Sequence, residues 1–320
     1  MKRIVTLMLA LCLFFTLTAC GAKKTPGELA AEAMPQTALW LRENVTDPTC
    51  AAVGGEWTVL GLARSGLEVP AEYFQIYREN ASAYTARQGG VLHEKKYTEY
   101  SRVILGMTAI GEDPRDVGGF DLLIPLADYE KTVFQGVNGP VFALLALDSG
   151  NYDIPRNTSG GTQATRELYV DFILGAELPE GGWSFAGGEA EADMTAMALQ
   201  ALARYRDRKD VSDAVERGVA VLASLVTEEG GYLSYGEASS ESVAQVIVAL
   251  TELGISLEDE RFLCKKATLV DRLLEYRKDD GSFSHTKEGQ GDILATEQAF
   301  YALVAAVRAS EGKPSLYTMK

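Results

Sequence analysis

The sequence predicts an all-α fold in which six apolar helices form an inner ring and six amphipathic helices surround it, as a closed α/α barrel in a single domain. Three observations lead to this prediction. Helical segments of two kinds alternate along the chain, and a loop with glycines and an aromatic residue recurs about every 50 residues. Six helix pairs of about 47 residues each account for most of the 320 residues, which argues against a second domain.

The predicted inner helices are apolar on nearly every side. Their centres read, for example, AMALQAL at 196–202 and VAQVIVAL at 243–250. A helix without a polar face is stable where neighbours cover it all round, so these helices belong to the inside of the barrel. We expect the inner helices at residues 57–64, 100–110, 141–147, 194–205, 242–253 and 298–308.

The predicted outer helices carry their charges on one face. In the fifth of them, Ala214, Gly218 and Leu222 share one side of the helix, and Asp213 and Glu216 face away from it. Such a helix covers a core with one side and meets solvent with the other. We expect the outer helices at residues 28–44, 71–87, 122–133, 163–176, 211–226 and 261–278.

The recurring loop joins the two helices of a pair. Its clearest copies are GGWSF at 181–185, GGYLSY at 230–235 and GSFSH at 281–285, and a weaker copy is GGVLH at 89–93. The first aromatic residues of the three clear copies are 49 and 51 residues apart. The aromatic side chains either anchor their loops by packing or grip a ligand by stacking; they are Trp183, Phe185, Tyr232, Tyr235 and Phe283.

With these repeats the chain resembles the terpenoid-cyclase/protein-prenyltransferase α/α-toroid superfamily, in particular the prenyltransferase/squalene-oxidase-repeat proteins of bacterial surfaces. The resemblance covers about residues 28–308 and implies an α6/α6 toroid. The superfamily holds cyclases, prenyltransferases, vitamin-B12 carriers and thioester proteins, so the resemblance implies several activities. It is carried by GGWSF at 181–185, ADMTAMALQALARY at 192–205, SSESVAQVIVALTELG at 239–254 and ATEQAFYALVA at 295–305.

The N-terminal segment predicts export and attachment to a membrane. Lys2 and Arg3 precede an apolar run at residues 4–17, which is typical of a signal peptide and short for a membrane span. The following LTAC resembles a bacterial lipoprotein box, which implies a signal peptide over 1–19 and a lipidated Cys20. A tether would then reach residue 27, and the toroid would occupy residues 28–320, outside the cytoplasm. The alternative is an ordinary secretory signal.

Two cysteines remain in the body of the chain. Cys12 lies in the predicted signal peptide and Cys20 is the predicted lipid carrier, which leaves Cys50 and Cys264. Outside the cytoplasm such a pair either forms a disulfide or stays as two free thiols, and the sequence leaves both possibilities open.

The charge balance excludes nucleic acid as a partner. The chain has 30 Lys and Arg residues against 45 Asp and Glu, a net charge of −15, and so it repels phosphate backbones. No phosphate-binding glycine loop stands out. His93 and His285 are the only histidines, and neither has a cysteine or carboxylate at metal-ligand spacing. We therefore expect no cofactor and no metal.

One carboxylate matches a catalytic motif of the superfamily. Class II cyclases protonate an alkene with the central acid of an Asp-x-Asp-Asp-Thr-Ala motif, and the corresponding stretch here is EADMTA at 191–196. Asp193 stands at the central position and Glu191 at the first, but Met194 replaces the next Asp. If the protein is cyclase-like, the resemblance implies Asp193 as the acid. The alternative is that Asp193 caps its helix.

A polar residue lies near the start of each predicted inner helix. Because the inner helices of such a ring run parallel, their starts meet at one mouth. The polar residues there either cap the helices or bind a ligand together with the neighbouring side chains. The candidate ligand-binding residues are Glu56, Trp57, Glu99, Tyr100, Asn138, Asp193, Glu241, Gln245, Glu297 and Tyr301.

The leading hypothesis is a membrane-anchored toroid that binds a small molecule at this mouth without catalysis. A corrinoid is one candidate ligand, because the B12 carriers share the toroid. The second hypothesis is a terpenoid cyclase or prenyltransferase-like enzyme that uses Asp193 as its acid. The third is a structural or interaction module of the cell envelope. The partners expected are thus a small molecule and the membrane, reached through the N-terminal lipid.

Overall fold

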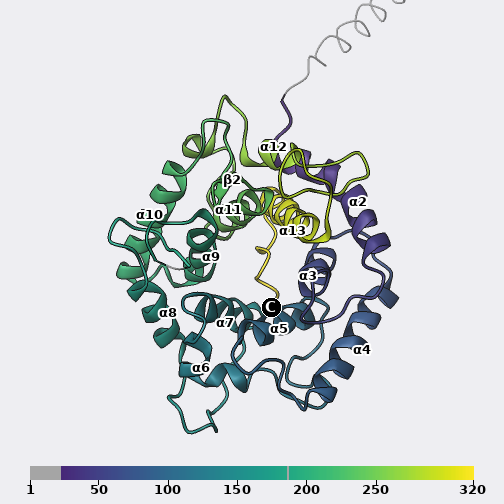
Figure 1. Ribbon diagram of the computed structural model, residues 1–320, viewed down its shortest axis with the longest axis vertical. Helices are drawn as coiled ribbons and strands as arrows, with labels where there is room; N and C mark the ends of the chain where they lie inside the picture. Colours follow the sequence, from purple (N-terminus) through teal and green to yellow (C-terminus); the bar gives the residue numbers. More distant parts are fainter. Residues whose placement is uncertain (1–22, 186) are drawn as a thin grey trace, which may run out of the picture.

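A computed structural model describes residues 23–185 and 187–320 of the chain. The predicted signal peptide and Cys20 lie outside the described residues. Figure 1 shows two concentric rings of helices, so the predicted all-α fold with an inner and an outer ring is confirmed. Within the described residues, no helix has the length and apolar character that crossing a membrane would require.

Six helices form the inner ring. Each of them packs against the next along the chain, and α13 packs against α3, so the ring is closed. Most residues of their middle turns are buried, as the apolar sequences predicted, but Met197 and Gln245 are only partly buried. The inner helices are α3 (Glu56–Arg64), α5 (Thr98–Ala109), α7 (Asn138–Ser149), α9 (Ala192–Leu202), α11 (Ser240–Glu252) and α13 (Ile293–Ser310).

Six helices form the outer ring, and each precedes its inner partner along the chain. In α10 the expected apolar stripe of Ala214, Gly218 and Leu222 is buried. A side chain on Gly218 would collide with Leu199 and Trp183, so this glycine allows close packing of α10 on α9. The outer helices are α2 (Pro26–Asn44), α4 (Ala71–Arg87), α6 (Tyr129–Val133), α8 (Arg166–Gly175), α10 (Lys209–Ser224) and α12 (Leu269–Leu274).

Two outer elements are shorter than the sequence pattern predicted. The stretch 122–133 contains the 3-10 helix η1 (Pro125–Ala127) and then α6, because the extended backbone of Asp128 interrupts the helix. The stretch 261–278 begins with η3 (Glu260–Phe262) and reaches α12 only after a turn in which Lys265 and Lys266 have φ of 52° and 67°. Left-handed residues cannot continue a helix, so the expected single helices are wrong here.

The three clear loop copies share one turn geometry. Gly181, Gly230 and Gly281 have φ of 89°, 91° and 92°, a region that side chains disfavour. In each copy, the N–H of the glycine donates to the carbonyl three residues earlier, at 2.8–2.9 Å. The weaker copy at 89–93 differs, because the N–H of Gly90 donates to the Thr85 carbonyl and thereby ends α4.

The first aromatic side chain of each clear copy anchors its loop. Trp183, Tyr232 and Phe283 are completely buried. The indole N–H of Trp183 donates to the Ile173 carbonyl at 2.7 Å, and its backbone N–H donates to the Thr195 hydroxyl at 3.0 Å. For these three residues the packing alternative holds, because their side chains are completely buried.

We expect Trp183→Ala to lower the free energy of unfolding by about 3–5 kcal/mol, because it leaves a large cavity and removes a buried hydrogen bond. Phe185→Ala in the same loop is the matched control. Its ring is 61% exposed, so the change should stay within about 0.5 kcal/mol. Urea unfolding followed by circular dichroism measures both. Equal losses in the two variants would contradict the assignment of Trp183 as the anchor.

The C-terminal residues enter the centre of the ring (Figure 1). This C-terminal tail, residues 311–320, is held at the end where the inner helices finish. The Arg64 guanidinium donates to the carbonyls of Ser315, Leu316 and Thr318 at 2.7–3.0 Å. The Glu252 carboxylate accepts from the Ser315 hydroxyl at 2.7 Å and from the backbone N–H of Tyr317.

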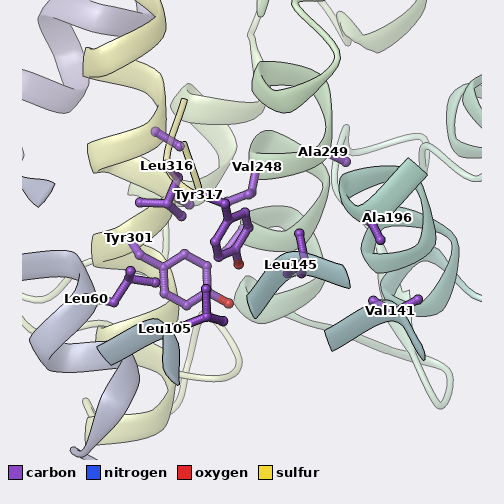
Figure 2. Packing of buried hydrophobic residues seen from close by; sticks show 14 of the residues in the cluster. Leu60, Leu105, Val141, Leu145, Ala196, Val248, Ala249, Tyr301, Leu316 and Tyr317 are labelled. Atoms are coloured by element: carbon purple, nitrogen blue, oxygen red, sulfur yellow. The ribbon is translucent and has the colours of Figure 1, made fainter. Parts of the chain in front are cut away.

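Tail side chains close that end of the ring. Leu316 is fully buried, and Tyr317 is nearly so. Figure 2 shows Leu316 and Tyr317 between the inner helices, with Tyr317 beside Tyr301 of α13. The tail therefore leaves the opposite end, where the inner helices begin, as the open mouth.

Cys50 and Cys264 are both free in the structure, which agrees with the free-thiol alternative. Cys264 lies between η3 and α12, where its thiol donates to the Glu228 carbonyl at 3.1 Å. Cys50 is buried between α2 and α3, and burial raises the pKa of its thiol to about 12. Each cysteine is thus packed in its own environment.

Candidate functional site

Two cavities at the mouth of the ring share Asp193. The outer cleft, of about 700 Å³, lies between loop residues 185 and 187–191 and the hairpin of β1 (Leu233–Ser234) and β2 (Glu237–Ala238). The inner pocket, of about 260 Å³, lies inside the ring. The inner pocket is lined by Trp57, Phe142, Asp193, Met197, Glu241, Gln245, Gln298, Tyr301 and Tyr317.

Aromatic rings form one wall of the inner pocket. The ring centroids of Trp57 and Phe142 are 5.8 Å apart, and those of Trp57 and Tyr301 are 5.9 Å apart, both at tilted angles. Tyr317 of the tail adds a fourth ring. The contacts join α3, α7 and α13, so the wall exists only because the ring is closed.

A hydrogen-bonded set of amides forms another part of the wall. The side-chain amide of Gln245 donates to the Tyr301 hydroxyl at 2.6 Å and to the side-chain oxygen of Gln298 at 3.1 Å. The amide of Gln200 donates in turn to the side-chain oxygen of Gln245 at 2.9 Å. These bonds fix the orientation of the polar groups at the base of the pocket.

Glu241 is held in place from two sides. One of its carboxylate oxygens accepts from the Ser239 and Ser240 hydroxyls at 3.0 and 3.1 Å. The same oxygen lies 2.8 Å from Nδ1 of His285, which comes from the loop before α13. This carboxylate is thus a fixed acceptor at the edge of the inner pocket.

Asp193 differs from Glu241 because one of its two carboxylate oxygens has no hydrogen-bond partner in the described chain. Its Oδ1 atom is buried and has no hydrogen-bond partner among the described residues. Burial raises the pKa of the Asp193 carboxyl above its usual value, and the nearby hydroxyls of Ser242 and Ser234 partly offset this rise. The hydroxyl of Ser242, also buried, has no partner in the described part of the chain either. A buried carboxylate oxygen without a partner is unfavourable, so a bound group that supplies one would stabilise it.

The structure does not support the capping alternative for Asp193. The N-cap of α9 is Glu191, and Asp193 lies in the first turn of the helix. The Glu191 carboxylate accepts from the Ser184 hydroxyl and the Phe185 N–H, both at 3.2 Å. Glu191 therefore holds the adjoining loop, and Asp193 is left as the carboxylate that faces both cavities.

Five of the ten predicted ligand-binding residues line the inner pocket: Trp57, Asp193, Glu241, Gln245 and Tyr301. The other five lie elsewhere. Tyr100 is buried beside a separate cavity near His93, and Glu99 pairs with Arg102. The side-chain oxygen of Asn138 is buried with no partner in the described chain.

Glu56 and Glu297 hold the loop before α3. Glu56 accepts from the Ala51 N–H at 2.7 Å, and Glu297 accepts from the Gly54 N–H at 3.1 Å and the Thr58 hydroxyl at 2.8 Å. Both carboxyls are fully buried. Neither residue lines the inner pocket, and Oε2 of Glu56 is buried without a hydrogen-bond partner in the described chain.

Four residues of the inner pocket are not among the ten predicted ligand-binding residues: Phe142, Met197, Gln298 and Tyr317. A signal existed for two of them. Phe142 and Met197 each follow a predicted polar residue by four positions, one helical turn, as Gln245 and Tyr301 do. Tyr317 had no signal, because only the fold brings the tail into the ring.

Known structures share this arrangement of helices. No protein-family model and no curated protein matches the sequence. The type II terpene cyclase MstE from Scytonema, in complex with geranylgeranyl dihydroxybenzoate, matches at 14% identity and TM-score 0.61 over 89% of this chain and 99% of its own. The fold is an α/α toroid.

Two further known structures have a similar toroid fold. Protein geranylgeranyltransferase-I from Candida albicans, complexed with GGPP, matches at 10% identity and TM-score 0.57 over 88% of this chain and 92% of its own. Unsaturated glucuronyl hydrolase from Bacillus sp. GL1 matches at 13% identity and TM-score 0.52, over 91% and 98%. These proteins differ in activity, so the likeness establishes the fold of the toroid alone.

Burial dominates the titration of two carboxyls in the toroid. It raises the pKa of Glu56 and of Glu297 to about 7, although Nε of Arg102 lies 4.0 Å from Glu56. Both groups therefore hold their protons more tightly in the folded state than in the unfolded state, where their pKa is 4.5. Between these two values the folded protein binds more protons, so stability falls as pH rises.

We expect the free energy of unfolding to decrease from about pH 5 to about pH 7.5, by up to roughly 3 kcal/mol for each carboxyl. The double variant Glu56→Gln, Glu297→Gln keeps the acceptor oxygens and removes the ionisation, so this slope should flatten. Chemical denaturation at a series of pH values measures it. Glu79→Gln, at an exposed position on α4, is the control and should keep the original slope. An unchanged slope in the double variant would refute the assignment.

Proposed function

We propose that the toroid binds a small molecule with an apolar body at the mouth of its inner helix ring, without transforming it. The observation that carries this proposal is the position of Asp193, whose unpartnered oxygen lies where the outer cleft and the inner pocket meet. Concave, largely apolar cavities with a few convergent polar groups are typical ligand sites.

Exposed apolar side chains around the outer cleft support the proposal. Phe185, Leu233 and Tyr235 are 61%, 51% and 96% exposed, and all three line the cleft. Exposure of three large apolar side chains around one cleft is unfavourable in water, and a bound apolar ligand would cover them.

The backbone conformation at Tyr235 also supports the proposal. Tyr235 and Gly236 form the two-residue turn between β1 and β2, with φ of 49° and 86°. Turns of this kind favour Asn-Gly, and a tyrosine in the left-handed region costs of order 1 kcal/mol or more. The local stability of the turn does not explain why a tyrosine occupies this position. A role of its side chain in covering a bound ligand does explain it.

The cavity size limits the ligand. A corrin macrocycle exceeds the 260 Å³ of the inner pocket, whose floor is closed by Tyr317. We therefore do not retain the corrinoid version of the binding hypothesis. A slender molecule is more suitable, with one end in the inner pocket and its body in the outer cleft.

The proposal includes a membrane anchor at Cys20, carried by the sequence of the N-terminal segment. The start of α2 lies beside the end of α13, since Gly27 contacts Ser310. The mouth lies at the other end of α13, which has 18 residues and is about 27 Å long. A lipid at Cys20 would thus hold the closed end of the toroid towards the membrane and leave the mouth accessible.

Cyclase activity is the second candidate, because burial raises the pKa of Asp193 and a proton-donating acid needs such a shift. Incubation with linear isoprenoid diphosphates and alcohols, followed by product analysis, tests it. A cyclic product that disappears in Asp193→Asn would support the enzyme. The third hypothesis, an envelope interaction module, gains support if no ligand binds, since the tail fills much of the ring.

Binding of the uncharged fluorescent probe N-phenyl-1-naphthylamine tests the proposed function. We expect saturable binding to the purified protein and a roughly tenfold loss of affinity in the double variant Phe185→Ser, Tyr235→Ser, since each ring contributes about 1 kcal/mol or more. Phe134→Ser is the matched control. Phe134 is 63% exposed and lies at the end of α6, away from the cleft, so its loss should not change the affinity. Absence of saturable binding would overturn the proposal.

A further inference from the structure

We propose that the group bound in the inner pocket is an alkylammonium head, so that the ligand of the toroid is a cationic amphiphile. This inference rests on the proposed function, which places a ligand across the inner pocket and the outer cleft. It adds the chemical class of that ligand, which follows from the aromatic rings, the carboxylates and the dimensions of the two cavities.

The aromatic wall is the first argument. Trp57, Phe142 and Tyr301 present their rings to one small volume, with ring centroids less than 6 Å apart in two pairs. The face of an aromatic ring carries negative charge density and attracts cations, most strongly in tryptophan. Several such rings around one cavity form the environment that recognises quaternary ammonium groups.

The carboxylates are the second argument. Asp193 and Glu241 line the same pocket, and no Lys or Arg is among its described lining residues. These two carboxylates favour a cation over an anion as the bound group. Glu241 already has hydroxyl and imidazole partners, whereas Oδ1 of Asp193 has none in the described chain. A cation beside Asp193 would compensate this buried charge without requiring a hydrogen-bond donor.

The dimensions are the third argument. A volume of about 260 Å³ accommodates a compact head such as trimethylammonium, but it lies below the range of cavities that enclose whole drug-sized ligands. The apolar chain of the ligand would continue past Asp193 into the outer cleft, between Phe185 and Tyr235. The acidic net charge of the protein would also raise the local concentration of such a cation.

Competition against bound N-phenyl-1-naphthylamine tests the inference. The competitors have one decyl chain and three heads: decyltrimethylammonium, the uncharged decyldimethylphosphine oxide and the anionic decyl sulfate, each below its micelle concentration. We expect the cation to compete at least tenfold more tightly than the phosphine oxide, and decyl sulfate to compete most weakly. Equal potency of the three heads would overturn the ammonium inference and leave the proposed function standing.

Two variants distinguish the effects of the Asp193 charge and the Trp57 ring from the effect of the shape of the pocket. Asp193→Asn keeps the size of the side chain and removes the charge, and Trp57→Leu keeps apolar volume and removes the ring face. Each should lower the affinity for decyltrimethylammonium about tenfold and leave that for the phosphine oxide within twofold. Asp207→Asn, at an exposed position after η2 (Ala203–Tyr205), is the matched control and should change neither affinity.

The remaining outcomes also decide the question. Equal losses for cation and phosphine oxide in Asp193→Asn would show a role in the shape of the pocket and overturn the inference. Thermal unfolding of each variant verifies that it is folded before the affinities are compared. If the fluorescent probe does not bind the unmodified protein, the proposed function fails and the ammonium inference fails with it.

Discussion

The packing of α13 against α3 closes the inner ring, and the other features of the structure depend on it. Gly61 of α3 leaves space for Phe300, because a side chain at this position would collide with the phenyl ring. The same contact brings Thr58 to Glu297 and Trp57 to Tyr301, residues more than 230 positions apart. Six helices that are apolar on all sides are stable only when this seam is sealed, since otherwise two of them would expose a face to water.

The sequence was sufficient for the fold and for half of the candidate site. Helix periodicity and the repeated loops predicted both rings, because each depends on local pattern. Polar residues near the starts of the inner helices looked alike in sequence, yet Glu297 serves a buried loop and Asp193 faces two cavities. The difference arises from the loop at 49–55. Its backbone N–H groups come within hydrogen-bonding distance of some of these carboxylates and not of others. Tyr317 could not be assigned because its position depends on tertiary contacts alone.

The loop aromatics show how one repeated motif serves two purposes. Trp183 is wholly buried and ties its loop to α8 and α9, while Phe185, two residues later, remains exposed at the outer cleft. A single loop thus supplies both an anchor and a wall of the outer cleft. A stable scaffold that presents variable loop residues explains how proteins with this toroid fold differ in activity while their helices superimpose.

The tail makes the candidate site depend on the order of folding. Its hydrogen-bond partners Arg64, Ser149 and Glu252 belong to α3, α7 and α11, which come together only in the complete ring. Contacts between residues so distant along the chain form late, because they require the closure of long loops. Tyr317 therefore reaches the floor of the inner pocket after the ring has assembled, and a partly folded chain has no finished pocket. Ligand affinity would then distinguish a fully folded toroid from one that has its helices but not its closure.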